Sequence, residues 1–296
     1  MKHFLIGTGR IFVLLLSSVC LGQQVSAQQG FVSDSVTIGG HVRYFQMYLP
    51  DGLVEKAPLV FVLHGYGGPI GVNRNWMTDA SDHHKFALCI PDGLPDPEGK
   101  KSWNVGYPFQ KGFGVDDVKA LCSMAEHVQK KYKLSEENTF ATGSSNGGEM
   151  CYLLAYSDQT TFKALAPIAG LTLVWMYKDL EAKRPIPLIE IHGTEDRTSE
   201  WTGDLENKGG WGAYMPVPLA VAYFVAKARC TKEVVGKIPG LNSKNGRYTI
   251  THKFLNGNDG IEVWLYEVVG APHGMLTGDI DTGEEVWKFF NKYLTE

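Results

Sequence analysis

Short apolar runs of strand length alternate along this sequence with segments of helical spacing, and no other feature restricts the fold as strongly. Residues 58–63 form a continuous apolar run, which is typical of a strand buried on both faces of a parallel sheet. Residues 115–131 and 284–293 have helical spacing instead. Strands that alternate with helices predict the α/β class, with a mostly parallel central sheet and helices on both faces.

The rest of the sequence continues this alternation. Further strands are expected at residues 86–90, 139–142, 164–168, 188–191, 248–254 and 261–268, and further helices after residue 148 and at 218–228. Gly39 and Gly40 separate the alternating runs 36–38 and 41–49, which predicts a hairpin at the start of the domain. Asp116 or Asp117 could cap the helix that begins near residue 115. In such sheets the active site lies at the carboxyl ends of the strands.

The first thirty residues have the layout of a secretory signal peptide. Lys2 and Arg10 supply positive charge, residues 11–16 are apolar, and residues 25–27 offer a small-residue cleavage site. The apolar run is too short for a membrane anchor. We therefore expect residues 1–27 to be a signal peptide and the mature protein to be secreted or periplasmic.

A lipoprotein modified at Cys20 is the alternative. Val19, directly before it, is larger than the residue that lipoprotein processing favours. No later stretch is long and apolar enough to cross a membrane, so no membrane association is expected after signal removal. Residues 28–296 contain no linker and no repeat, which predicts a single domain.

Charge and cysteine content exclude several functions. The net charge of −4 arises from 28 basic and 32 acidic residues without long runs of one sign, so no nucleic-acid surface is expected. Four cysteines follow the signal peptide and allow three complete pairings, which the sequence does not distinguish: Cys89, Cys122, Cys151 and Cys230. Cys89 lies in an apolar run, which favours a buried free thiol. The cysteine spacing has no zinc pattern, so no structural metal is predicted.

A glycine-flanked serine carries the strongest functional signal. Gly143-Ser144-Ser145-Asn146-Gly147 matches the G-x-S-x-G nucleophile elbow, in which glycines permit a tight turn between strand and helix. On its own the pattern is equally typical of a Gly/Ser-rich loop, but a strand-like run precedes it and a helix-forming segment follows. We therefore predict the α/β-hydrolase fold, with Ser145 as nucleophile and Ser144 as a structural neighbour.

A serine nucleophile needs a base and an orienting acid, which follow it in this fold in the order acid, then histidine. Asp196 lies in the loop after the strand at residues 188–191 and is the predicted acid, with Glu195 as a solvated alternative. His273 lies after the strand at residues 261–268 and is the predicted base.

The other histidines of the mature chain fit this role less well. His192 precedes Asp196 and is expected to support its loop by hydrogen bonds, and His252 is expected on a strand face. The remainder precede the serine: His41, His64, His83, His84 and His127.

The oxyanion of the reaction needs backbone N–H donors. One should be Asn146, directly after the nucleophile. The other should come from the segment His64-Gly65-Tyr66-Gly67-Gly68, which is similar to the HGGG-type oxyanion loop. Tyr66 is the first choice there and Gly67 the second.

These motifs together resemble the secreted esterases of the feruloyl esterase and polyhydroxybutyrate depolymerase group, which includes the first carbohydrate esterase family. The resemblance covers nearly the whole mature chain. It rests on Arg43-Tyr44, Tyr48-Leu49-Pro50, residues 63–68, Ser102-Trp103-Asn104, residues 115–118, residues 143–148, residues 166–170, His192-Gly193-Thr194-Glu195-Asp196 and Pro272-His273-Gly274.

The resemblance implies cofactor-free hydrolysis of esters on plant cell-wall polysaccharide, such as feruloyl groups on xylan. An acetyl xylan esterase or a depolymerase-like polyesterase is the alternative. The depolymerase-like members have Trp-Pro after the catalytic histidine, whereas Gly274-Met275 follows His273 here, which leaves the acyl group open. A serine peptidase and a carbohydrate-binding protein with an inactive site are more distant alternatives.

Aromatic side chains could bind the acyl group or the sugar, because rings stack on flat or apolar faces. Trp103, Trp201 and Trp211 are the candidates, with ordinary packing as the alternative for each. Trp264 and Trp287 have strand and helix spacing and are predicted to be core residues.

Overall fold

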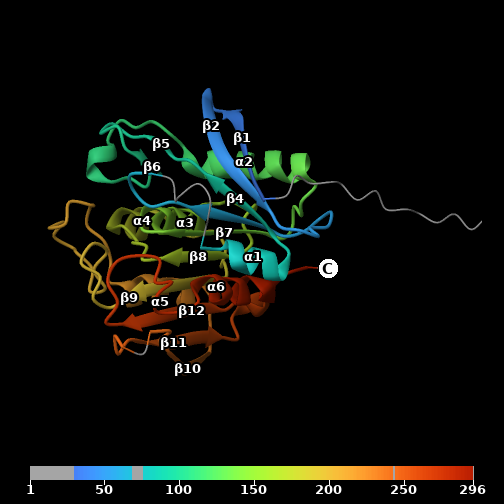
Figure 1. Ribbon diagram of the computed structural model, residues 1–296. Helices are drawn as coiled ribbons and strands as arrows, with labels where there is room; N and C mark the ends of the chain where they lie inside the picture. Colours follow the sequence, from blue (N-terminus) through green and yellow to red (C-terminus); the bar gives the residue numbers. More distant parts are fainter. Residues whose placement is uncertain (1–29, 69–75, 243, 296) are drawn as a thin grey trace, which may run out of the picture.

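The centre of the molecule is a ten-stranded sheet with helices on both faces (Figure 1). The computed structural model describes residues 30–68, 76–242 and 244–295. In spatial order the strands are β1 (Gly30–Ile38), β2 (His41–Leu49), β4 (Ala87–Pro91), β3 (Leu59–Leu63), β7 (Thr139–Ser144), β8 (Leu165–Ile168), β9 (Leu188–Gly193), β12 (Val263–Val269), β11 (Tyr248–Leu255) and β10 (Lys232–Pro239). The short strands β5 (Leu94–Pro95) and β6 (Lys101–Ser102) form a separate pair.

The middle of the sheet is parallel and its two sides are antiparallel. Neighbouring strands from β4 to β12 run parallel, whereas β1 and β2 flank them on one side and β11 and β10 on the other in antiparallel pairing. Every residue of β3, β7 and β9 is buried. This confirms that the apolar runs are central strands of a mostly parallel sheet.

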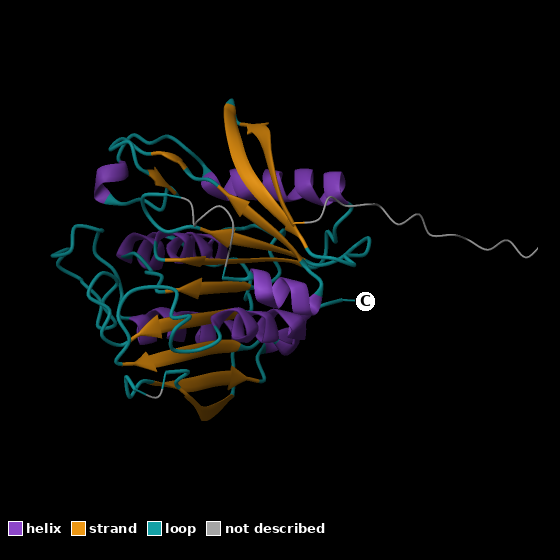
Figure 2. Cartoon of the chain, viewed as in Figure 1, coloured by secondary structure: helices purple, strands orange, loops and turns teal. Residues whose placement is uncertain are grey.

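The helices cover the two faces unequally (Figure 2). They are α1 (Thr78–His84), α2 (Asp117–Tyr132), α3 (Asn146–Tyr156), α4 (Val174–Asp179), α5 (Val217–Ala228) and α6 (Thr282–Phe290). Alternate residues of β3 show the two layers. Phe61 belongs to the core cluster that includes side chains of α2, α3 and α5, and Val62 belongs to the cluster that includes those of α1 and α6. Trp264 and Trp287 are also core residues, as predicted.

The hairpin at the start of the described chain has the predicted turn. β1 and β2 pair antiparallel up to Ile38 and His41, so the loop consists of Gly39 and Gly40 alone. Their φ angles are 58° and 82°, a left-handed conformation that glycine adopts without the clash of a Cβ atom. The two glycines therefore fix the register of both strands.

Asp116 is the N-cap of α2, which resolves the choice between two neighbouring aspartates. The side chain of Asp116 accepts a hydrogen bond from the Lys119 N–H at 2.9 Å, as an N-cap does. Asp117 is buried instead and pairs with Arg43 at 2.8 Å. This ion pair joins α2 to β2, beneath the loop that leads into Trp103.

The four described cysteines are free thiols. Cys89 is fully buried on β4, as predicted. In the described part of the chain no helix combines the length and hydropathy of a membrane span. The predicted signal peptide and Cys20 lie outside the described residues.

Candidate active site

The three predicted catalytic residues follow three parallel strands whose carboxyl ends lie at one edge of the sheet. Ser145 directly follows β7, Asp196 lies in the loop after β9, and His273 lies in the loop after β12. The spatial order of these strands is β7-β8-β9-β12, and neighbouring strands lie about 4.8 Å apart. The topology therefore brings three loops that are distant in sequence to one place.

Ser145 occupies a strained backbone conformation between β7 and α3. Its φ of 56° and ψ of −124° are unusual for a residue with a Cβ atom. Its N–H donates to the Ile168 carbonyl at 2.9 Å, and its carbonyl accepts from the Glu149 N–H at 2.9 Å. These bonds hold the sharp turn that a nucleophile elbow requires.

The glycines around Ser145 are required by close backbone packing. A Cβ atom on Gly143 would lie 2.6 Å from the carbonyl carbon of Gly147, and one on Gly147 would lie 2.7 Å from that of Leu63. Gly148 approaches Gly170 in the same way, where a Cβ atom would lie 2.9 Å from the Gly170 Cα. The glycine pattern therefore reflects a turn in which no larger side chain fits.

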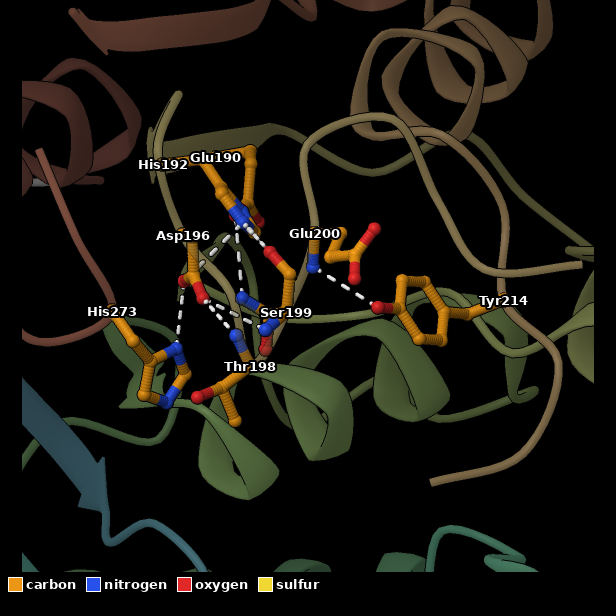
Figure 3. A network of polar contacts seen from close by, with 9 residues as sticks. Glu190, His192, Asp196, Thr198, Ser199, Glu200, Tyr214 and His273 are labelled. Carbon is orange, nitrogen blue, oxygen red and sulfur yellow. Dashed lines mark hydrogen bonds and ion pairs between the residues drawn. The ribbon is translucent and has the colours of Figure 1, made fainter. Parts of the chain in front are cut away.

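Asp196 and His273 form a hydrogen-bonded pair (Figure 3). The Asp196 Oδ2 lies 2.7 Å from the His273 Nδ1. The other carboxylate oxygen accepts the N–H groups of Thr198 and Ser199, each at 2.8 Å. Asp196 is buried, whereas the alternative acid Glu195 is exposed. The geometry therefore selects Asp196 as the residue that orients the imidazole.

Close contact between the two loops brings the pair together. A Cβ atom on Gly193 would lie 2.8 Å from the carbonyl carbon of Ala271, so the backbones of the two loops touch. The Glu195 N–H donates to the Ala271 carbonyl at 3.0 Å. These contacts place His273 beside Asp196.

The predicted oxyanion loop after β3 lies next to Ser145. A Cβ atom on Gly65 would lie 3.4 Å from the Ser145 Cβ. The Gly67 N–H donates to the Lys101 carbonyl at 3.0 Å and is therefore already engaged. This favours the first choice, Tyr66, as the donor from this loop.

His64 fixes the orientation of that donor. Its Nε2 accepts the Gly93 N–H at 2.8 Å, so the proton is on Nδ1, which lies 2.6 Å from the Gly65 carbonyl oxygen. Burial lowers the pKa of His64, which agrees with a neutral ring. The carbonyl of Gly65 and the N–H of Tyr66 belong to one trans peptide and point in opposite directions. Because the contact with His64 fixes the Gly65 carbonyl, it also fixes the direction of the Tyr66 N–H.

The predicted role of Trp103 as a substrate platform is wrong. Its side chain is only 1% exposed, so it offers no face to a substrate. Its indole N–H donates to the His64 carbonyl at 2.9 Å, and its backbone exchanges two hydrogen bonds with the Asn146 side chain, at 2.7 and 3.1 Å. Trp103 therefore links the predicted oxyanion loop to Asn146 by hydrogen bonds. Asn146 is the first residue of α3, and the N–H groups at the start of a helix have no partner within that helix.

Trp211 belongs to an aromatic cluster that consists of the half-buried Tyr66, Phe109 and Trp211 and the buried Tyr107. The ring centroids within the aromatic cluster lie 5.0 to 6.3 Å apart. Burial and a hydrogen bond to Asp96 raise the pKa of Tyr66 to about 12, so its ring is a neutral phenol. Trp201 is half-buried and lies near the predicted acid. Its ring is edge-on to that of His192, with 6.0 Å between the ring centroids.

Three buried ionisable side chains lie next to the candidate triad. His192 was expected to support the acid loop, and it contacts Glu190 and Ser199. Glu190 and Glu149 were not singled out from the sequence. Burial and the proximity of Glu190 raise the pKa of Glu149 well above its usual value, and Glu149 accepts a hydrogen bond from the Tyr107 hydroxyl. Glu190 has a signal in the sequence, because it is a carboxylate within the apolar run of residues 188–191.

One cluster of described residues has donor atoms suited to a metal. His83 Nδ1, His84 Nε2 and a carboxylate oxygen of Glu284 lie within 4.8 Å of one another. The group joins α1 to α6, and the two imidazoles already contact the carboxylate at 3.2 and 2.8 Å. It is separate from the loops that carry the candidate triad.

The fold and the geometry of the elbow define an α/β-hydrolase, and comparison with known proteins agrees. Residues 98–217 match the prolyl oligopeptidase family. The chain is similar to a bifunctional acetylxylan esterase/xylanase of Neocallimastix patriciarum, with 22% identity over 87% of this chain and 34% of that protein. It is also similar to a probable feruloyl esterase C of Aspergillus flavus, with 24% identity over 84% of this chain and 83% of that protein.

A solved structure supports the fold. The acetyl xylan esterase from Aspergillus awamori superposes with a TM-score of 0.58 and 15% identity, covering 88% of this chain and 99% of that one. The chain spans 34% of the length of the Neocallimastix protein. It spans 61% of a poly(3-hydroxyalkanoate) depolymerase C of Paucimonas lemoignei and 42% of a feruloyl esterase B of Neurospora crassa. The chain therefore has the α/β-hydrolase fold, as the sequence predicted.

Proposed function

We propose that this chain is an exported serine esterase that removes feruloyl groups from xylan in plant cell walls. The observation that carries the ester-hydrolase part is the contact of 2.7 Å between Asp196 and His273, at the sheet edge where Ser145 occupies the elbow. The names of the relatives support carbohydrate esters as the substrate class.

The proposed reaction is acyl transfer in two steps. His273 takes the proton of the Ser145 hydroxyl as its oxygen attacks the ester carbonyl, and Asp196 holds the imidazole in the required tautomer. The N–H groups of Tyr66 and Asn146 stabilise the oxyanion. The imidazolium then returns its proton to the departing alkoxide, which leaves as an alcohol. Water, deprotonated by His273, finally releases the acid and regenerates Ser145.

The aromatic cluster supports an aromatic acyl group. Tyr66 is both a predicted oxyanion donor and a member of this cluster, and its ring packs edge-to-face on that of Trp211 with the centroids 5.4 Å apart. The cluster therefore begins at the loop that would bind the reacting carbonyl. Flat rings bind edge-to-face or stacked against other rings. A feruloyl ring therefore suits this surface better than an acetyl group does, and acetyl xylan or a polyhydroxybutyrate ester is the alternative.

Substrate comparison tests this proposal. We expect turnover of methyl ferulate to exceed that of p-nitrophenyl acetate and of a short polyhydroxybutyrate, and Ser145→Ala to abolish all turnover. Trp211→Ala should raise KM for methyl ferulate about tenfold, equivalent to about 1.4 kcal/mol, and leave KM for the acetate unchanged. Equal effects on both substrates would rule out an aromatic acyl site at Trp211.

A serine peptidase is the second candidate, because residues 98–217 match the prolyl oligopeptidase family. That segment contains Ser145 and Asp196. Incubation with unblocked and blocked proline-containing peptides separates the two activities. Cleavage of these peptides at rates above those of the esters would favour the peptidase.

Export is a separate proposal that depends on the first 27 residues. N-terminal sequencing of the protein from the culture medium or periplasm of the native host should begin at Gln28. A protein that retains Met1 in the cell, or one that carries lipid at Cys20, would contradict cleavage after Ala27.

A further inference from the structure

A second imidazole lies behind the candidate acid, buried on the far side from His273 (Figure 3). The side chains of Glu190 and His192 are both 0% exposed, and they extend from alternate positions of β9. The His192 Nδ1 lies 2.7 Å from the Glu190 Oε1, and its Nε2 lies 2.7 Å from the Ser199 carbonyl oxygen. The ring therefore bridges the strand to the loop that carries Asp196.

The partners of His192 determine where its protons lie. A carbonyl oxygen only accepts hydrogen bonds, so the Nε2 must carry a proton that it donates to Ser199. The contact between Nδ1 and Glu190 must contain a proton too, because two lone pairs at this distance would repel each other. The pair therefore shares one proton, either as imidazolium and carboxylate or as imidazole and carboxylic acid.

Two pKa shifts agree with a retained proton. Burial raises the pKa of Glu190 despite its contact with His192. Burial alone would lower the pKa of His192, but the hydrogen bond and charge of Glu190, together with the Ser199 carbonyl and the charge of Asp196, outweigh burial and the pKa is raised.

The contact with Ser199 acts on the catalytic carboxylate through the backbone. Asp196 receives the N–H groups of Thr198 and Ser199 on its Oδ1, so these two peptides set the direction of the carboxylate. The donor on His192 anchors the carbonyl of that same Ser199. The His192 Nε2 lies 3.7 Å from the Asp196 Oδ2, which leaves this oxygen to His273.

We propose that Glu190 and His192 are positioning residues that hold the turn of residues 196–199, so that Asp196 presents Oδ2 to His273. This inference rests on the proposed function, because it assigns the pair to the same reaction. Two buried ionisable groups are a costly way to fill a core, since apolar residues of similar volume would often stabilise it as well. A geometric role in the acid loop accounts for their presence.

Two substitutions at His192 separate its two contacts. In His192→Gln the terminal amide reaches the position of Nε2 and keeps the donor to Ser199. In His192→Asn the shorter amide reaches the position of Nδ1, keeps the contact with Glu190 and leaves the Ser199 carbonyl without its donor. We expect kcat on methyl ferulate to fall about tenfold to a hundredfold in His192→Asn, with KM unchanged, because small displacements of catalytic groups have effects of this size. His192→Gln should stay within about threefold of wild type on the same reasoning.

Thermal unfolding of both variants provides the structural control. Two folded variants with equal kcat, or a change confined to KM, would overturn the proposal. If His192→Asn does not fold, nuclear magnetic resonance of the wild-type protein with 15N-labelled histidine decides. The Nε2 of His192 should show a slowly exchanging proton near neutral pH, whichever partner of the pair holds the shared proton at Nδ1, and an unprotonated Nε2 would overturn the proposal. A failure of the proposed function is distinct, because wild type would then show no ester turnover while this spectrum remained as expected.

Discussion

The loop after β7 and the loop after β9 bring side chains to the same sheet edge, but different forces hold them in place. Around Ser145 the backbone segments touch directly, and Gly143 and Gly147 leave no room for a side chain. Around Asp196 a series of hydrogen bonds from Thr198, Ser199 and His192 fixes the loop. The backbone of the candidate nucleophile is fixed mainly by close packing, whereas the carboxylate of the candidate acid is oriented by polar contacts.

This difference determines what each region tolerates. Where backbone segments pack closely, added side-chain volume lowers the stability of the fold. Where hydrogen bonds hold a side chain, removal of a donor or acceptor changes the orientation of one carboxylate. Substitutions in the elbow should therefore change stability first, and substitutions in the acid loop should change rate first.

The largest expected effect is that of Asp196→Asn. In this variant the amide oxygen keeps accepting the N–H groups of Thr198 and Ser199, so the amide NH2 faces the His273 Nδ1 and favours the wrong tautomer. We therefore expect kcat to fall about 10⁴-fold with the fold intact. Glu195→Gln is the matched control, since Glu195 is exposed, and it should keep wild-type kcat. Steady-state kinetics on methyl ferulate compare the two. A large loss in Glu195→Gln with none in Asp196→Asn would exchange their assignments.

The next effect is a loss of stability in the closely packed elbow around Ser145. In Gly147→Ala the new methyl group would collide with the carbonyl group of Leu63, which is central backbone and cannot move aside. We expect a loss of about 1–3 kcal/mol in the free energy of unfolding, measured with urea. Gly278→Ala is the control, because no atom lies within 4 Å of its added Cβ. Equal stability of the two variants would refute the steric account of the elbow.

A pH dependence sharpens the comparison, because Glu149 is a buried carboxyl group next to the elbow, and its effect per pH unit is smaller than either of the two above. Its pKa is raised in the folded protein, whereas an unfolded glutamate titrates near about 4.3. The stability it contributes is therefore fully present below that pH and is lost as pH rises through the folded pKa. Glu149→Gln lacks this dependence, so its stability relative to wild type should increase with pH, by at most about 1.4 kcal/mol per unit. Urea unfolding at several values between pH 5 and 8 measures the difference, and a constant difference would contradict the shift.

Much of the site could be predicted from the sequence because its signals are local. The glycine pattern around Ser145 reports contacts within a few residues, and each catalytic loop follows an apolar strand. β10 escaped prediction because it is an edge strand whose residues are almost all exposed, with no alternation. The short helices α1 and α4 were also missed.

The misassigned and overlooked residues depend on long-range contacts. Trp103 lies among polar residues, which suggested an exposed ring, but its own N–H donates to the Asn146 side chain and the N–H of its neighbour Asn104 donates to Asp117, and the indole is buried in the core. Glu190 interrupts an apolar run and contacts His192 two residues further along the same strand, but the contact of His192 with Ser199 forms only when the loop after β9 folds back against the ring. The sequence patterns therefore pointed to the candidate triad more readily than to the side chains that contact it.

Covalent labelling tests the central claim most directly, which is that Ser145, His273 and Asp196 act as one unit. A fluorophosphonate probe should modify the wild-type protein, and mass spectrometry of its peptides should place the label on Ser145. Ser145→Ala should take up no label, and His273→Ala should react far more slowly, because its serine lacks a base. A label on another residue, or equal labelling of wild type and His273→Ala, would contradict the account.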